Sequence, residues 1–108
     1  MVKLSRQKIY ILDGAMGTEI QERKLSDEKF IYEGIPCDGF NDILCLTSSQ
    51  TIRSIHKSYV DAGATIIETN SFNANYLSAL DYGLPDDTID LINFSAAKIA
   101  KSVATQSK

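Results

Sequence analysis

Two short runs of small and polar residues in the sequence could bind a ligand. The first is DGAMGT at residues 13–18, and the second is ETNSF at residues 68–72. An ionised carboxylate is costly to bury without a cationic partner, so Asp13 is a candidate acceptor for a ligand ammonium group. Gly14 and Gly17 would let a ligand and the backbone approach closely. The first run therefore predicts a site for the amino group of a small ligand.

An ordinary structural role for Asp13 stays open at this point. A turn aspartate commonly caps the helix that follows it, and residue types alone do not separate that role from ligand binding. A nucleotide site is disfavoured, because Gly14 and Gly17 match neither a GxGxxG fingerprint nor the GK[ST] of a phosphate-binding loop.

Two predicted strands place these runs in space. Residues 8–12 form a short apolar run that ends at Asp13, and residues 64–69 form a β-rich run without alternation, typical of a parallel strand covered on both faces. A helix over residues 48–62 would join the strands as a right-handed crossover. Ligands meet the C-terminal ends of parallel strands, so we expect Asp13 and residues 68–72 to lie side by side at one edge.

Hydrophobic spacing and capping signals predict the helices. Thr47 and Gln50 form a candidate capping box for the helix over residues 48–62, and Gly63 marks its end. The clearest helix begins at Asp86. Its predicted core positions are Ile89, Ile92, Ala96, Ile99 and Val103. The other predicted elements are a short helix over residues 15–24, a long loop over 25–42, and a loop with a helical turn over 70–80.

Composition and charge narrow the functional classes. The chain has 108 residues, of which 44% are hydrophobic and 23% charged, as is ordinary for a globular domain. The formal net charge is −3 and no basic stripe is present, so no nucleic-acid partner is expected. No apolar run approaches the roughly 20 residues that cross a bilayer, and no signal peptide is recognisable. We therefore expect no membrane partner and a cytoplasmic location.

Several conspicuous residues are assigned no chemistry. The spacing of Cys37 and Cys45 fits neither a CxxC redox motif nor a zinc knuckle, and tetrahedral zinc needs more ligands than these thiols supply. Two reduced thiols are expected. His56, the sole histidine, is expected to be a packed or surface residue. The aromatic residues expected in the core are Tyr10, Tyr59 and Phe94.

Four motifs occur in order along the chain: DGAMGT at 13–18, ND at 41–42, AGA at 62–64 and ETNSFN at 68–73. In this order and spacing they resemble the homocysteine S-methyltransferase family, and the likeness covers nearly all of the chain. PCD at 36–38 and INFSAAK at 92–98 are also similar to the N-terminal homocysteine-binding domain of the branch that contains cobalamin-dependent methionine synthase. Ala15 departs from the family pattern, which commonly has a second glycine there.

The resemblance implies that residues 1–108 are the N-terminal portion of a homocysteine-binding domain of the α/β class. They would form the first two or so βα units, with parallel strands, of a TIM-type (β/α)8 barrel, which needs roughly 250 residues. In that family, cysteines of later strands hold a zinc ion that stabilises the homocysteine sulfur as a thiolate. The thiolate attacks an electrophilic methyl group to give methionine. Cobalamin and methyltetrahydrofolate would be further cofactors of the full-length protein.

The resemblance also assigns site residues. The substrate-binding candidates are Asp13, Gly14, Glu68, Thr69, Asn70 and Phe72. The family's homocysteine-binding aspartate falls on Asp13, and its substrate-wall positions fall on Thr69 and Phe72. Glu68 and Asn70 could instead tie loops together by hydrogen bonds. No catalytic residue and no metal ligand is expected within this chain.

An isolated pair of βα units would leave apolar inner faces without partners. We therefore expect the chain alone to be inactive, and to need the remainder of the barrel or other copies of the chain to cover those faces. Another functional class stays open, namely a non-catalytic module that binds homocysteine or docks onto another subunit.

Overall fold

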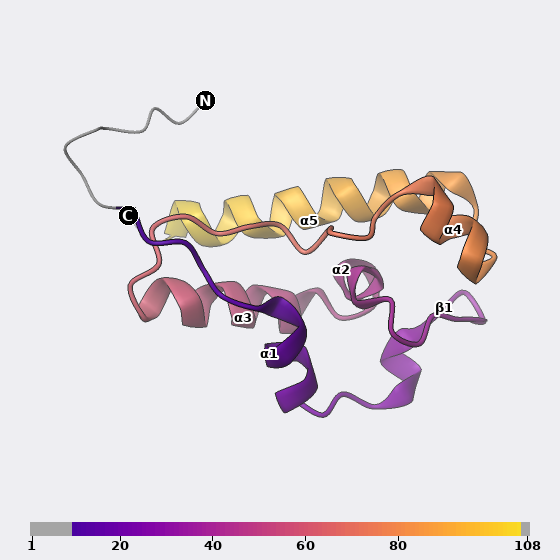
Figure 1. The fold of residues 1–108 in the computed structure, drawn as a ribbon, viewed down its shortest axis with the longest axis horizontal. Coiled ribbons are helices and arrows are strands. Elements are labelled where there is room, and N and C mark those ends of the chain that lie inside the picture. Colours follow the sequence, from indigo (N-terminus) through magenta and orange to yellow (C-terminus); the bar gives the residue numbers. More distant parts are fainter. Residues whose placement is uncertain (1–9, 107–108) are drawn as a thin grey trace.

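The structure is a computed structural model that describes residues 10–106 of the chain. Its elements, in chain order, are α1 (Met16–Glu22), η1 (Asp27–Phe30), β1 (Ile31–Tyr32), β2 (Ile35–Pro36), η2 (Asn41–Ile43), α2 (Leu44–Thr47), α3 (Ser49–Asp61), α4 (Tyr76–Tyr82) and α5 (Asp86–Gln106). The unit is elongated, measuring 48 × 28 × 19 Å along its principal axes. Helix α5 runs along one long side, α3 and α2 pack against it, and α1 and the β1 hairpin lie on the far side of those helices (Figure 1).

The buried face of helix α5 confirms the prediction made from the hydrophobic periodicity of its sequence. The positions predicted to be in the core, which are Ile89, Ile92, Ala96, Ile99 and Val103, are all buried. Asp86 and Asp87 occupy its first turn, where negative charge is favoured by the helix dipole. Phe94 was expected in the core but is 67% exposed. Residues two apart lie on different sides of a helix, so burial of Ile92 turns Phe94 toward solvent.

Helix α3 buries Ile52, Ile55 and His56 beneath α5, but its predicted capping box is not formed. Its N-cap is Ser48, and no side chain caps the helix. An unpredicted turn, α2, directly precedes it, and Thr47 is the last residue of that turn. The Thr47 hydroxyl donates to the carbonyl of Lys29 at 2.5 Å, and its oxygen accepts no amide from the first turn of α3.

Residues 25–42 are more ordered than the predicted long loop. They contain η1, the antiparallel β1–β2 hairpin and the start of η2. The hairpin turn places Glu33 at φ 50° and Gly34 at φ 81°, and positive φ at both central residues is the geometry of a tight two-residue turn. Glu33 gives no sequence signal for this geometry, because only its glycine neighbour commonly adopts positive φ.

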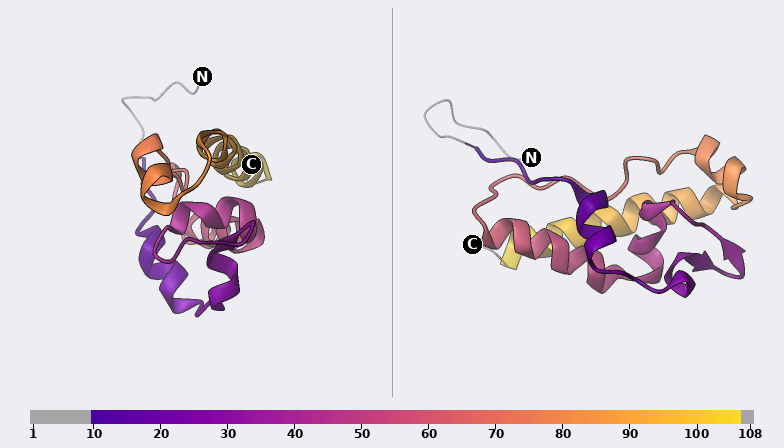
Figure 2. Two further views of the ribbon diagram at one scale, coloured as in Figure 1. Left: turned by 90° about the vertical axis from the view of Figure 1, so that its right-hand side faces the viewer. Right: turned by 60° about the horizontal axis from the view of Figure 1, so that its bottom comes forward.

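The predicted parallel strands are confirmed in direction and proximity but not in extent. Leu12 and Ile66 form an isolated parallel bridge, and the amide of Asp13 donates to the carbonyl of Ile66 at 2.9 Å. The extended segments that contain Leu12 and Ile66 lie side by side in Figures 1 and 2. Lys8 and Ile9, in the predicted first strand, lie outside the described residues. Among residues 10–106 the hairpin is the only sheet, so the unit is helix-dominated.

The parallel pairing is short for a physical reason. A parallel strand is stable when neighbours cover both of its faces. Ile11 and Leu12 are 53% and 57% exposed, so this segment has no such cover in the described unit.

The segment after residue 69 matches its prediction of a loop and helical turn. Helix α4 begins after Asn75, whose side chain accepts a hydrogen bond from the Ser78 amide at 3.0 Å. It ends at Gly83, which has φ 71° in the left-handed region that glycine favours. None of the helices formed by residues 10–106 combines the length and apolar character needed to cross a membrane.

Candidate functional site

The carboxylate of Asp13 is bonded directly to the start of the second predicted site segment. Its Oδ2 accepts a hydrogen bond from the Glu68 backbone amide at 3.0 Å. The helix-capping role for Asp13 is not seen, because the N-cap of α1 is Ala15 and no side chain caps that helix. The expected juxtaposition of Asp13 with the end of the second strand is therefore confirmed.

The carboxylate of Asp13 can accept hydrogen bonds beyond the one from Glu68. The residue is partly buried, and an ionised carboxylate can accept several hydrogen bonds through its two oxygens. The ion pairs found among residues 10–106 join Arg23 to Glu19 and Lys57 to Asp61, so neither uses Asp13. A ligand ammonium group is the kind of partner that such a carboxylate binds most strongly.

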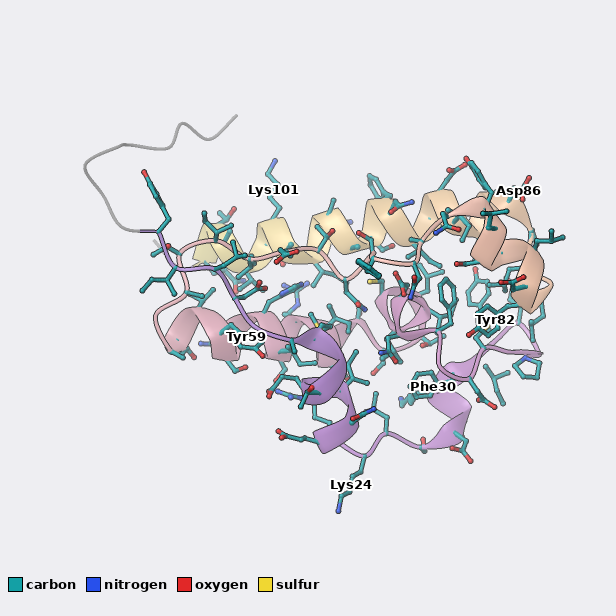
Figure 3. All side chains as sticks on the ribbon, viewed as in Figure 1. Lys24, Phe30, Tyr59, Tyr82, Asp86 and Lys101 are labelled. Atoms are coloured by element: carbon teal, nitrogen blue, oxygen red, sulfur yellow. The ribbon has the colours of Figure 1, made fainter. Side chains whose placement is uncertain are left out.

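Gly14 makes room for Tyr59. A Cβ atom at position 14 would lie 2.8 Å from the phenol oxygen of Tyr59, closer than atoms pack. That oxygen donates a hydrogen bond to the carbonyl of Ala15 at 3.0 Å. Figure 3 shows Tyr59 on α3, next to the segment that leads into α1. The close approach at Gly14 in this structure is thus made by a tyrosine, and contact of Gly14 with a ligand stays a prediction.

Asn70 ties its loop to the helical core. It is 7% exposed, and its Nδ2 donates to the Asn41 carbonyl at 3.0 Å. The Cys45 thiol donates to the Asn70 carbonyl at 3.3 Å. Burial raises the pKa of Cys45 to about 12, so the thiol stays protonated at neutral pH. Of the two roles open to Asn70, the structure shows the loop-tying one.

The remaining candidates lie on the exposed part of the same segment. Glu68 and Thr69 are exposed, and the Thr69 hydroxyl is hydrogen-bonded to that of Ser71 at 2.6 Å. Phe72 is 96% exposed. The structure therefore brings Asp13 and Glu68 together and presents Thr69 and Phe72 from the loop that follows, whereas Asn70 is buried beneath it.

Asp42 is a functional candidate that sequence reasoning did not single out. It is 3% exposed, and its Oδ2 accepts a hydrogen bond from the Asn73 amide at 2.8 Å. Burial raises the pKa of this carboxyl, although the hydrogen bond from Asn73 acts in the opposite direction. Its place in the ND motif at 41–42 was the available signal.

His56 is fully buried on α3. Neither ring nitrogen has a hydrogen-bond partner among the described residues. Burial lowers the pKa of His56, and the negative charge of Asp13 acts weakly in the opposite direction. The expectation of a packed or surface histidine is met by a packed one.

The cysteines do not fit a zinc site. Both are free and buried, and their thiols donate to backbone carbonyls, Cys37 to that of Ile35 and Cys45 to that of Asn70. Within residues 10–106 no group of three or more histidine, cysteine or acidic side chains is placed to hold a metal ion. A pocket of about 410 Å³ lies elsewhere, between α3 and α5, and none of the predicted site residues lines it.

Comparison with known families agrees with the order of the sequence motifs. The sequence model of the homocysteine S-methyltransferase family matches residues 10–108. The match spans both segments that meet at Asp13 and Glu68, together with α5. The chain therefore belongs to the homocysteine S-methyltransferase family.

Proposed function

We propose that this chain is the N-terminal portion of a homocysteine-binding domain in an enzyme that methylates homocysteine to methionine. In this proposal Asp13 binds the ammonium group of homocysteine. The observation that carries it is the hydrogen bond from the Glu68 amide to the Asp13 carboxylate, which fixes an acceptor at the rim where two extended segments end. Membership of the family supports homocysteine as the substrate.

The other site residues would contact the rest of the homocysteine molecule beside Asp13. Thr69 offers a hydroxyl, and Phe72 offers an exposed apolar ring that a hydrocarbon chain could cover. Gly14 and Glu68, which adjoin Asp13 in sequence and through the Glu68 amide, would lie next to the bound ligand with their backbones. In the reaction, the homocysteine sulfur forms a bond to the methyl carbon as the bond from that carbon to its donor breaks.

The cofactor sites are proposed to lie in other segments of the full-length protein. Cys37 and Cys45 are buried, and their thiols donate hydrogen bonds to backbone carbonyls, so we assign the zinc ligands to other segments. Cobalamin and methyltetrahydrofolate are likewise assigned to other segments. The exposed apolar side chains of Ile11, Leu12 and Phe72 need a cover that the rest of a barrel or another copy would supply. We therefore propose that the chain alone is inactive.

Calorimetric titration of homocysteine into the full-length protein that carries this sequence tests the proposal. Replacing Asp13 with Asn should weaken homocysteine binding by about 10- to 100-fold, since the negative charge that pairs with the ammonium group is lost. The matched control is Asp38→Asn, which removes an exposed carboxylate and should change nothing. Unchanged affinity in Asp13→Asn would overturn the assignment.

A ligand without the amino group gives a second arm. Wild-type protein should bind homocysteine more tightly than 4-mercaptobutyrate, and this preference should disappear in Asp13→Asn. A preference that survives in the variant would place the ammonium group elsewhere. If the protein binds homocysteine but transfers no methyl group to it from any methyl donor, the result would favour the non-catalytic binding module.

A further inference from the structure

Asp42 is a buried acidic side chain in the interior of the described unit. Burying a carboxylate costs free energy unless hydrogen bonds or a cation compensate it. The ion pairs of residues 10–106 do not involve Asp42, and its side chain accepts the Asn73 amide at 2.8 Å. Asp42 is therefore a buried carboxylate whose desolvation is unfavourable, and its hydrogen-bond partner is the backbone amide of Asn73 in the loop at residues 69–73.

A second anchor holds the same loop from the same side. The Asn70 side chain donates to the carbonyl of Asn41, the residue next to Asp42, at 3.0 Å. The Cys45 thiol donates to the Asn70 carbonyl at 3.3 Å. The loop is thus fastened at residues 70 and 73, with Phe72 between the two anchors.

Phe72 has little else to hold it. Its side chain is 96% exposed, so packing does not fix its place. The anchors at residues 70 and 73 flank Phe72 and hold its backbone. Thr69 lies between Asn70 and Glu68, and the Glu68 amide is bonded to Asp13 itself. Displacing a substrate wall by even a small distance weakens binding, because the contacts depend on close approach.

From these contacts we propose that Asp42 is a positioning residue for the homocysteine-binding loop at residues 69–73, which it clamps through the Asn73 amide. The inference rests on the proposed function, because that function makes Thr69 and Phe72 the substrate wall. Asp42 touches no substrate in this account, and it acts only by fixing the loop.

Amide hydrogen exchange in the wild-type protein tests the clamp itself. The Asn73 amide should exchange at least about tenfold more slowly than that of Phe72, as a hydrogen-bonded amide does next to an exposed one. Equal rates for the two amides would overturn the proposal. This arm needs no variant and no ligand.

Calorimetry with homocysteine tests the consequence for binding, because it reports stoichiometry and affinity separately. In Asp42→Ala the dissociation constant should rise about tenfold at unchanged stoichiometry, and Asp42→Asn, which keeps an oxygen acceptor, should recover most of the affinity. Asp38→Asn is the control for lost negative charge. A purely structural role would lower the stoichiometry and leave the dissociation constant unchanged, which would overturn the proposal.

The two hypotheses fail differently. If the wild-type protein does not bind homocysteine, the proposed function is wrong, whatever Asp42 does. If the wild type binds and Asp42→Ala binds equally well, only the positioning role is wrong. If Asp42→Ala does not fold, the exchange rates of wild type and the affinity of Asp42→Asn decide.

Discussion

The phenol of Tyr59 occupies the space that a side chain at position 14 would need. A Cβ there would meet both the Oη and Cε1 atoms of Tyr59 at 2.8 Å. This contact joins the segment that carries Asp13 to helix α3, and a side chain at position 14 would displace the phenol.

Gly14→Ala should therefore lower the free energy of unfolding by about 1 kcal/mol, because the added methyl group displaces the phenol and breaks its hydrogen bond to Ala15. Gly17→Ala is the matched control: the nearest atom to its new Cβ would be 3.7 Å away, and it lies in α1, where alanine is the better helix former. Urea unfolding measures both. In a Tyr59→Leu background the penalty of Gly14→Ala should disappear, and a penalty that persists would contradict this account.

The packing of α5 gives a second prediction. Ile92 is fully buried, so Ile92→Ala should destabilise the unit by about 2–5 kcal/mol. Phe94→Ala, on the exposed side of the same helix, should change stability by less than about 0.5 kcal/mol. Thermal unfolding followed by circular dichroism compares them. Equal losses would mean that the burial pattern of α5 is incorrect.

His56 should make stability depend on pH. Burial lowers its pKa in the folded state below the ordinary value of 6.5, so the unfolded chain takes up the proton first. The contribution is fully present above pH 6.5 and is lost as pH falls below it, with a slope of at most about 1.4 kcal/mol per pH unit. The free energy of unfolding of His56→Leu, measured across this range, should lack that slope. Parallel curves for the two proteins would refute the prediction.

Cys45 should be chemically inert in the folded protein. Burial raises the pKa of its thiol to about 12, and only a thiolate reacts readily with alkylating agents. Iodoacetamide at neutral pH should therefore label Cys45 only after urea unfolds the chain, as mass spectrometry of the peptides would show. Rapid labelling of Cys45 under native conditions would mean that Asn70 does not stay packed against it.

The parts of the fold that depend on local periodicity were predictable from the sequence. The spacing of Ile89, Ile92 and Ile99 predicted the buried face of α5, and the run before Asp13 predicted its meeting with Glu68. The parallel direction of that meeting follows from a general rule about crossovers, which needs no knowledge of side-chain contacts.

The parts that depend on contacts between distant residues were not predictable. No pattern shows that the hydroxyl of Thr47 bonds to Lys29, or that Tyr59 lies against Gly14. The role of Asp42 was missed for the same reason, since its partner, Asn73, lies in another segment. The ND motif at 41–42 contains Asp42, but a motif does not distinguish a ligand contact from a loop anchor.

The bridge between Leu12 and Ile66 also has a kinetic consequence. The bond from the Ile11 amide to the Thr65 hydroxyl joins residues 54 positions apart, so the chain must close a long loop before this bond can form. Helices α3 and α5 form their first turns from local contacts, and we expect them to be in place earlier. Pulse-labelled amide exchange during refolding should show the amides of Asp13 and Ile66 among the last to be protected, so that the edge that carries Asp13 forms only after the helices beneath it.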